Sequence, residues 1–290
     1  MEAGRRWAFF SVAASLALAV LNITTGVISH STSVTAAGLE FAGDVLASLI
    51  VFLGMWMASR PADEDHPYGH GRFEILAGLI VGIILVVAGA GIGLHSMRSL
   101  TADPVTPLAA AIWAPVLSAI VKAVTAVSKF RIGRQIGSAA LIADAWNDSV
   151  DILSATTAVS ALALTLSDPT RFAHADAYGG FAVGIIVVVT GLRVVRDTSL
   201  ELTDTMPPVS LLEEIRNVAL EVSGVEGVEK CFARKTGFRY HVDLHIEVDP
   251  AMTVAESHAI AHRVQEHLVE RVAFVAGVLV HIEPVPSSRK

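Results

Sequence analysis

The stretch Gly38–Leu49, GLEFAGDVLASL, lies inside an apolar run from Ser33 to Met57 and carries the only two charges of that run, Glu40 and Asp44. Residues four positions apart lie on the same face of a helix, one turn from each other. A charged side chain at the centre of a bilayer costs about 3 kcal/mol even on the lenient scales. If the run spans a membrane, both acids must therefore face the bundle interior, a cavity or a cation.

The composition of the 290-residue chain indicates a membrane protein. Hydrophobic residues make up 53% of it and charged residues only 17%, against about 25% charged residues in soluble domains. The deficit of charge falls on residues 7–200, whereas residues 201–290 have ordinary polarity. A helix needs about 20 apolar residues to cross ~30 Å of hydrocarbon. Six segments qualify, which predicts an all-α transmembrane bundle within residues 1–205: Trp7–Ile28, Ser33–Met57, Phe73–Leu94, Leu108–Val127, Ala139–Leu166 and Tyr178–Val195.

The distribution of Lys and Arg predicts the orientation of the bundle, because cytoplasmic loops carry the excess of these residues. With the N-terminus inside, the outer loops hold only Arg98 and Arg171. Both termini are then expected in the cytoplasm, and the brevity of the chain favours a bacterial plasma (inner) membrane. The nine residues assigned to the inner flanks and loops are Arg5, Arg6, Arg60, Arg72, Lys129, Arg131, Arg134, Arg193 and Arg196.

Residues 206–290 are expected to form a cytoplasmic α+β domain with the order αββαβ. Pro207 and Pro208 mark its start. Helical periodicity covers 209–222 and 253–271, and alternation typical of strands covers 227–234, 238–248 and 277–283. Thr253, followed three residues later by Glu256, is a predicted helix N-cap. About 80 residues give a thin core, so a dimer partner is expected to help stabilise the domain.

The fifth apolar segment carries a second pair of polar residues at helical spacing, Asn147 and Asp151. A helical wheel places Asp144 and Asp148 along the same stripe. If that stripe faces the acids of the second segment, three carboxylates and one amide oxygen surround one ion, a donor set that suits a divalent cation. The alternative is that these acids cap helices, face water between helices or pair with Lys122 in the fourth segment.

A third polar cluster lies in the long loop Ala58–Arg72. Asp63, His66 and His70 have the spacing of metal ligands, and imidazole with carboxylate suits zinc-like ions. An acidic loop that is simply solvated and binds nothing is the alternative. The single cysteine excludes an internal disulfide and a CxxC zinc site. The formal net charge of −7 argues against a nucleic-acid partner.

Several motifs, in this order, give the chain a family resemblance. They are DEDHPYGHGRFE (63–74), ADAWND (143–148), SLELTDTMP (199–207) and YHVDLHIEVDP (240–250). With six apolar segments and an αββαβ tail, the chain resembles the cation diffusion facilitators, which export divalent metals in exchange for protons. The resemblance implies a homodimeric transporter in a lipid bilayer, with a metallochaperone-like tail that responds to metal and clamps two protomers together. It implies neither an enzyme nor a small organic substrate.

The resemblance also assigns metal ligands. It implies a transport site of two residues from the second span and two from the fifth, which match the four that the spacing selects. The implied ligands are Glu40, Asp44, Asn147 and Asp151 for transport, Asp63, His66 and His70 in the loop, and His245, His258, His281 and Glu283 in the tail, with His241 and Glu229 as further candidates. His262 and His267 are interpreted as ordinary surface residues.

The expected substrate follows from departures from the family pattern. Zinc-transporting members usually place a His in the four-residue site, but here Asn147 holds that position and Glu40 replaces a shorter acid or His. An all-oxygen site favours Mn²⁺ or Fe²⁺ over Zn²⁺. Efflux of Zn²⁺, Co²⁺ or Cd²⁺ by the same mechanism is the alternative. In the expected cycle, protons and metal alternate on the three carboxylates. Their three negative charges outnumber the two positive charges of the ion.

Three other classes remain open from the residues alone. A membrane-anchored metal sensor or storage protein predicts saturable binding without flux. A membrane-embedded metallohydrolase needs a general base beside an open coordination position, and no HExxH motif is present. A channel needs weak sites that hold several ions.

Overall fold

The computed structural model describes residues 2–101, 106–136, 139–237 and 239–286, and for 2–11, 133, 136 and 139–144 it describes the backbone alone. The chain divides into two compact units. The first comprises Met1–Val51 and Ile80–Val195, and the second comprises Phe52–Leu79 and Arg196–Lys290.

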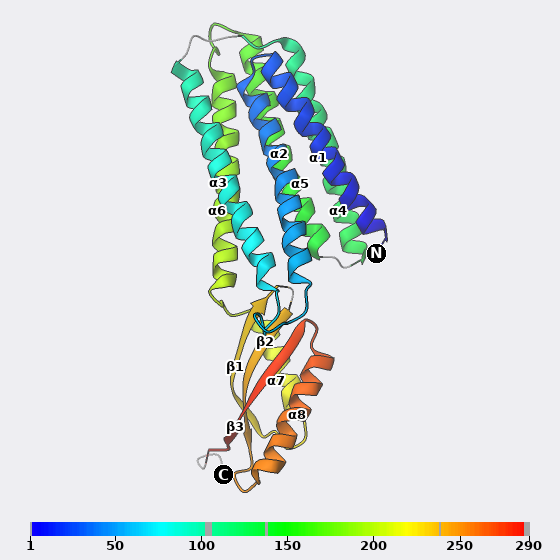
Figure 1. Cartoon of the computed structure of the whole chain (residues 1–290). Helices are drawn as coiled ribbons and strands as arrows, with labels where there is room; N and C mark the ends of the chain where they lie inside the picture. The colour runs from blue at the N-terminus through cyan, green and yellow to red at the C-terminus, as the bar shows by residue number, and fades with distance from the viewer. Residues whose placement is uncertain (1, 102–105, 137–138, 238, 287–290) are drawn as a thin grey trace. The chain divides into compact units, whose positions relative to one another are not determined.

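Six long helices run through the described residues up to 202 (Figure 1). Five of them contain a whole predicted apolar segment, and the fourth segment, Leu108–Val127, begins before α4 and ends within it. The prediction of a six-helix transmembrane region is confirmed. Five of the described helices are long and apolar enough to cross a membrane, and the apolar part described for the first is the shorter Val12–Ile28. Their bounds are α1 Glu2–Ile28, α2 Thr32–Ala58, α3 Arg72–Thr101, α4 Trp113–Ile136 after a short 3₁₀ turn at Ala109–Ile112, α5 Ala139–Ser167 and α6 Ala175–Leu202.

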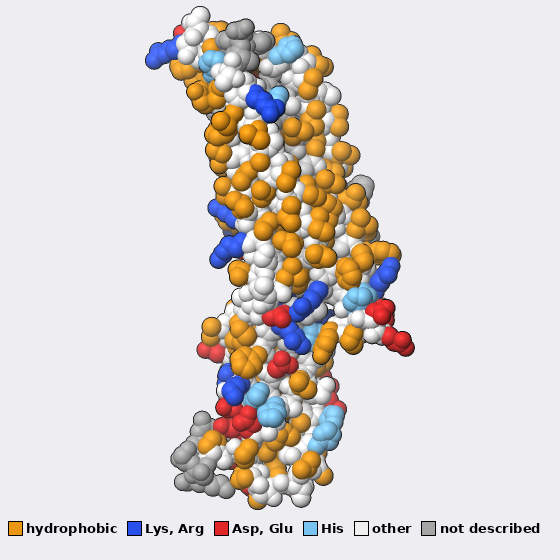
Figure 2. All heavy atoms as spheres, turned by 60° about the vertical axis from the view of Figure 1, so that its left-hand side comes forward, with side chains coloured by type: hydrophobic (Ala, Val, Ile, Leu, Met, Phe, Trp, Pro, Cys, Tyr) orange, Lys and Arg blue, Asp and Glu red, His pale blue; other side chains and the backbone are white. Residues whose placement is uncertain are grey.

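Large apolar side chains cover the outside of these helices. Val87 on α3 is 67% exposed and Trp113 at the start of α4 is 71% exposed. Figure 2 shows hydrophobic side chains gathered over the helical face. Contiguous apolar surface on this scale is a feature of proteins that contact lipid or a partner. The helices are therefore apolar on the faces that meet the bilayer and carry their buried polar groups inside the bundle.

Glycines bring α3 and α6 into direct backbone contact. A Cβ atom on Gly89 would lie 2.8 Å from the backbone nitrogen of Val188, and one on Gly184 would lie 2.8 Å from that of Gly93. Small residues at such positions let membrane helices approach closely, and packing then replaces the missing hydrophobic driving force. At these glycines, the backbones of α3 and α6 consequently pack directly against each other, and we call this contact the glycine seam.

A buried carboxylate joins the start of α6 to the start of α2. Asp176, in the first turn of α6, accepts hydrogen bonds from Ser31 Oγ at 2.8 Å and Ser33 Oγ at 2.5 Å. It also accepts one from the backbone N–H of Thr32 at 2.5 Å. An acidic side chain at a helix N-terminus satisfies free N–H groups and opposes the positive end of the helix dipole. This bond network fixes the two helix starts to each other.

The tail has the predicted αββαβ order. In the described residues its elements are α7 Val209–Leu220, β1 Gly227–Thr236, β2 Arg239–Val248, α8 Val254–Arg271 and β3 Val275–Pro284. The sheet order is β1-β2-β3, with β1 antiparallel and β3 parallel to β2. The parallel pair needs a crossover, and α8 supplies it. The first residue of the predicted second strand, Phe238, lies outside the described residues.

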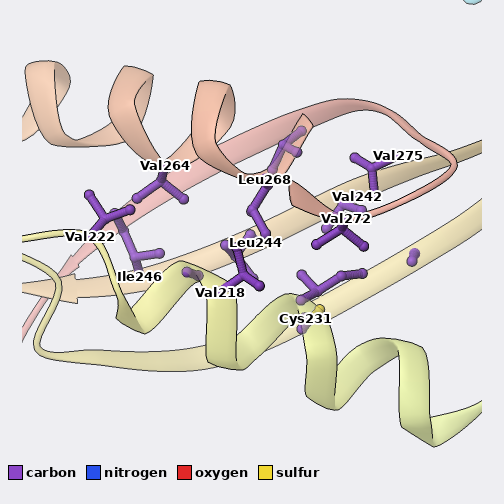
Figure 3. Packing of buried hydrophobic residues seen from close by; sticks show 14 of the residues in the cluster. Val218, Val222, Cys231, Val242, Leu244, Ile246, Val264, Leu268, Val272 and Val275 are labelled. Atoms are coloured by element: carbon purple, nitrogen blue, oxygen red, sulfur yellow. The ribbon is translucent and has the colours of Figure 1, made fainter. Parts of the chain in front are cut away.

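The apolar residues of the tail collect between its sheet and its two helices. Leu244 and Ile246 of β2 are fully buried, as are Val264 and Leu268 of α8, which point toward the sheet in Figure 3. Thr253 caps α8 as predicted, because its hydroxyl accepts from the backbone N–H of Glu256 while the Glu256 side chain accepts from the backbone of Thr253. The tail thus has its own core.

Candidate metal sites

A cavity of about 270 Å³ lies inside the first unit, between α2, α3, α5 and α6. Glu40 and Asp44 reach it from one turn of α2, and Asn147 and Asp151 reach it from one turn of α5. The structure therefore brings together all four residues that the sequence predicts for a transport site. The spacing of four residues on each helix is what turns both members of a pair toward the same space.

Two of the three acids at this cavity are buried, Asp44 is partly exposed, and Glu40 is only partly satisfied by protein donors. Glu40 and Asp151 are 6% and 2% exposed. Ser154 Oγ donates to Glu40 Oε1 at 2.8 Å, whereas Glu40 Oε2 is buried without a hydrogen-bond partner in the part of the chain that the structure describes. Buried polar atoms are nearly always paired in native proteins. An unpaired carboxylate oxygen at a cavity lined by further carboxylates suits a cation as its partner.

Lys122 of α4 also reaches this group of acids. Its Nζ lies 2.5 Å from Asp151 Oδ2 and 3.9 Å from Asp44 Oδ2. The two interpretations of the buried acids, a cation site and pairing with Lys122, are thus both realised in the geometry. A carboxylate has two oxygens and about four lone-pair directions, so one ammonium contact leaves Asp151 further acceptor capacity.

Asp148 has a different place from the one that the helical wheel suggested. It does not line the cavity but pairs with Lys122 at 3.3 Å and with Lys129 Nζ at 2.7 Å. Lys129 is fully buried, so it is not one of the exposed charges of the inner flank among which it was counted. The sequence could have indicated this burial, because Lys129 lies two helical turns after Lys122, on the same face of α4. The side chain of Asp144 lies outside the described residues.

The loop site in the second unit is assembled by a tight turn. Asp63 Oδ2 lies 3.3 Å from His70 Nε2, and Asp63 Oδ1 lies 3.5 Å from His66 Nδ1. The backbone N–H of His66 donates to Asp63 Oδ1 at 2.7 Å, and this bond is the chief reason that the pKa of Asp63 is lowered. Gly69, with φ of +81°, supplies the left-handed conformation that returns His70 to the cluster. The three residues are close enough to share one metal ion.

His70 is oriented for coordination by its second nitrogen. Its Nδ1 lies 3.1 Å from the carbonyl oxygen of Pro61. A carbonyl only accepts hydrogen bonds, so the tautomer with its proton on Nδ1 donates to Pro61 and leaves Nε2, which lies beside Asp63 Oδ2, able to bind a metal. Metal-bound histidines are commonly fixed by this kind of bond from the other ring nitrogen. The geometry therefore fits a ligand at Nε2.

The tail site joins neighbouring strands of the sheet. The parallel register pairs His245 of β2 with His281 of β3, and their ring centroids are 4.7 Å apart. His245 Nδ1 lies 2.7 Å from Glu283 Oε1 and 4.0 Å from Glu229 Oε2. The hydrogen bond with His245 is the chief reason that the pKa of Glu283 is lowered. His245, His281 and Glu283 lie close enough to bind one ion.

Two further histidines predicted for the tail lie apart from this cluster in the single chain. His258 is on α8, with its Nε2 3.1 Å from that of His262. His241 lies on β2, four residues before His245, and its ring makes an edge-on contact with the ring of Tyr68. Burial, with a smaller effect of Arg234, lowers the pKa of His241.

The fold and these clusters define a class: an integral membrane protein with six transmembrane helices, carboxylates at a cavity between them and a separate α+β domain that carries a cluster of histidines and a carboxylate. Two family models match the chain. The cation efflux transmembrane domain matches residues 8–203, and the cytoplasmic domain of cation efflux proteins matches residues 207–285. The chain belongs to the cation diffusion facilitator family. It is a transporter of divalent cations rather than an enzyme, and its dimerisation domain implies a homodimer.

Curated relatives match over nearly the whole length. The manganese efflux system proteins MneP and MneS of Bacillus subtilis are 26% and 29% identical, each over 98% of this chain and 97% of the relative. The magnetosome protein MamB of Magnetospira sp. is 30% identical over 96% of this chain and 94% of the relative. The solved structure of MamM-CTD is 28% identical and covers 27% of this chain and 93% of its own, with a TM-score of 0.26.

Proposed function

We propose that the protein exports Mn²⁺ or Fe²⁺ from the cytoplasm in exchange for protons, through a site formed by Glu40, Asp44, Asn147 and Asp151. The observation that carries the proposal is the meeting of these side chains at one cavity, with a buried oxygen of Glu40 unpaired within the described residues. Passage through the membrane is favoured over sensing, because a sensor needs no acids deep in two spans.

The choice of metal is supported by the donor atoms. Carboxylates and one amide offer only oxygen, and harder cations such as Mn²⁺ prefer oxygen to the imidazole and thiolate ligands that select zinc. Two relatives are named as manganese efflux proteins. Zn²⁺ is the second candidate, since most sites bind zinc more tightly than manganese or iron and selectivity then depends on geometry and availability.

The mechanism that we propose is alternating access. A site open to the cytoplasm binds the metal through its ionised carboxylates, and the site then opens to the other side. There, protons compete with the metal for the same oxygen atoms, and the protonated site returns. The arginines around the predicted inner ends, with the buried Lys129 left out of the count, support an orientation with both termini in the cytoplasm. The bacterial inner membrane is the location that we propose.

The loop and tail clusters are proposed as additional metal sites that regulate transport. Their support is the convergence of a carboxylate and two imidazoles in each, with all ligand atoms within 4.8 Å of one another. Such donor sets suit zinc-like and first-row transition metals. Metal bound in the tails of a homodimer is proposed to draw the tails together and to favour one transmembrane state.

The test is metal flux in proteoliposomes with an imposed pH gradient. Asp44→Asn and Asp151→Asn should each abolish Mn²⁺ flux, because each removes a charged ligand and a proton-carrying group. Asp197→Asn is the matched control, since Asp197 is an exposed acid on α6 that lies outside the cavity and pairs with its neighbour Arg196. Wild-type flux in both ligand variants overturns the proposal, and so does saturable Mn²⁺ binding by the wild type without flux.

A further inference from the structure

Lys122 is shared among three acids rather than paired with one. Its ammonium group is within 4.0 Å of carboxylate oxygens of Asp44, Asp148 and Asp151. It also donates to Ser15 Oγ at 2.9 Å, and its side chain is only 4% exposed. Asp148 already has a second partner in Lys129, at 2.7 Å. The charge of Lys122 is therefore available to the acids of the transport cavity.

The formal charges of this buried group can be counted. Among the side chains that the structure describes, it contains the four carboxylates of Glu40, Asp44, Asp148 and Asp151 and the two ammonium groups of Lys122 and Lys129, which gives these six groups a net charge of −2. We propose that Lys122 is a positioning residue that sets this value, so that one divalent cation neutralises the site, and that it thereby limits the affinity for metal. The inference rests on the proposed transport site at Glu40, Asp44 and Asp151.

The physical reason is the high cost of unbalanced charge away from water. In a low-dielectric site, each uncompensated charge is expensive, and attraction between opposite charges is strong. The three acids at the cavity carry −3 by themselves, which would hold a divalent ion with one negative charge in excess. With Lys122 against Asp151, the same ion brings the site to neutrality, and the ammonium repels the ion enough to permit release.

Lys122 has the chemistry that this role requires. A lysine is a compact point charge on a flexible four-carbon stem, so its ammonium can remain near Asp151 while the carboxylate turns an oxygen to a metal. Its Nζ lies over the ring of Phe41, 5.3 Å from the ring centroid. Phe41 stands on α2 between the two acids of that helix, so the ammonium is held beside both halves of the site.

The experiment measures Mn²⁺ affinity by calorimetry on the purified full-length protein and flux in proteoliposomes. Lys122→Met should bind Mn²⁺ at least about tenfold more tightly, because a positive charge in contact with the carboxylate ligands has been removed. In flux, its KM should fall and its kcat should fall as well, since release is slowed. Lys122→Arg keeps the charge and should rescue both parameters, and Ser15→Ala, which removes only a neutral contact, should leave the affinity unchanged.

A double variant separates net charge from a purely structural role. Lys122→Met combined with Asp148→Asn removes one charge of each sign and restores −2, so its affinity should return to that of the wild type. It also balances the buried charges if the single variant fails to fold. The inference is overturned if Lys122→Met binds Mn²⁺ no more tightly than the wild type, or if the double variant binds much more tightly than the wild type.

Failure of this inference is distinguishable from failure of the proposed function. If flux survives in Asp44→Asn and Asp151→Asn, the proposed transport site itself is wrong. If those variants lose flux but Lys122→Met binds Mn²⁺ with unchanged affinity, only the proposed role of Lys122 is wrong.

Discussion

At the scale of the residue, Asn147 is the neutral member of the four side chains at the transport cavity. It follows Trp146 on α5 and stands one turn before Asp151. An amide oxygen offers a ligand of the same hardness as a carboxylate but without charge, whereas an imidazole nitrogen at this position would suit zinc. The identity of this one residue should therefore influence which metal is carried.

Asn147→His is expected to give a gain of Zn²⁺ flux relative to Mn²⁺ flux, because it replaces an oxygen donor by an imidazole. Parallel measurements of Zn²⁺ and Mn²⁺ uptake in proteoliposomes check this. Asn147→Gln, which keeps an amide, is the control and should not gain zinc transport. Equal zinc flux in the wild type and in Asn147→His would contradict the argument from donor hardness.

The residues at the cavity could be predicted because helical spacing is local. Two polar residues four positions apart in an apolar helix share a face whatever the rest of the fold does, and this placed Glu40 with Asp44 and Asn147 with Asp151. For Asp148, the sequence left a place on the cation-facing stripe and a pair with Lys122 as alternatives, and the choice between them could not be made in the same way. Its contacts with Lys122 and Lys129 depend on how α4 and α5 are rotated against each other, and the sequence pattern of one helix does not contain that angle.

At the scale of the element, hydropathy found each helix but not its ends. The third predicted segment stops at Leu94 and the sixth at Val195, whereas α3 continues to Thr101 and α6 to Leu202. Hydropathy marks the part of a helix that is apolar enough for hydrocarbon, but backbone hydrogen bonding continues into polar residues beyond it. In the tail, alternation predicted the strands, while the parallel pairing of β3 with β2 follows from the crossover through α8.

The link between α2 and α6 gives a prediction on stability. Asp176→Ala removes the acceptor for two hydroxyls and one backbone N–H, and leaving such buried donors unsatisfied costs about 1–3 kcal/mol. The Tm of the purified protein in detergent should fall accordingly. Asp176→Asn keeps one acceptor oxygen and should lose less. An unchanged Tm in the alanine variant would show that the two helix starts are held by other contacts.

At the scale of the whole molecule, the tail cluster and the implied homodimer lead to a measurable movement. We expect bound metal to shorten the distance between the two tails of a dimer, because the cluster of His245, His281 and Glu283 is partly exposed and an ion bound there can take a further ligand from a second tail. Replacing both histidines by alanine should abolish the shortening. His267→Ala is the matched control, since His267 on α8 contacts Glu221 and lies outside the cluster.

The distance can be measured by pulsed electron paramagnetic resonance on the full-length dimer. The chain has a single cysteine, Cys231, which is buried, so Cys231→Ser with Ala255→Cys on the exposed first turn of α8 gives one spin label per tail. Titration with Mn²⁺ or Zn²⁺ should shift the distance distribution to shorter values. The same shift in the double alanine variant would count against metal binding at this cluster as its cause.

The glycine seam between α3 and α6 limits where the bundle can open. Separating those two helices would break backbone-to-backbone packing at Gly89, Gly184 and Gly191 at once, whereas the cavity already parts this pair from α2 and α5. We therefore expect α3 and α6 to move together as one rigid pair. The least costly passage for an ion then runs beside this pair, past the acids, rather than between its two helices.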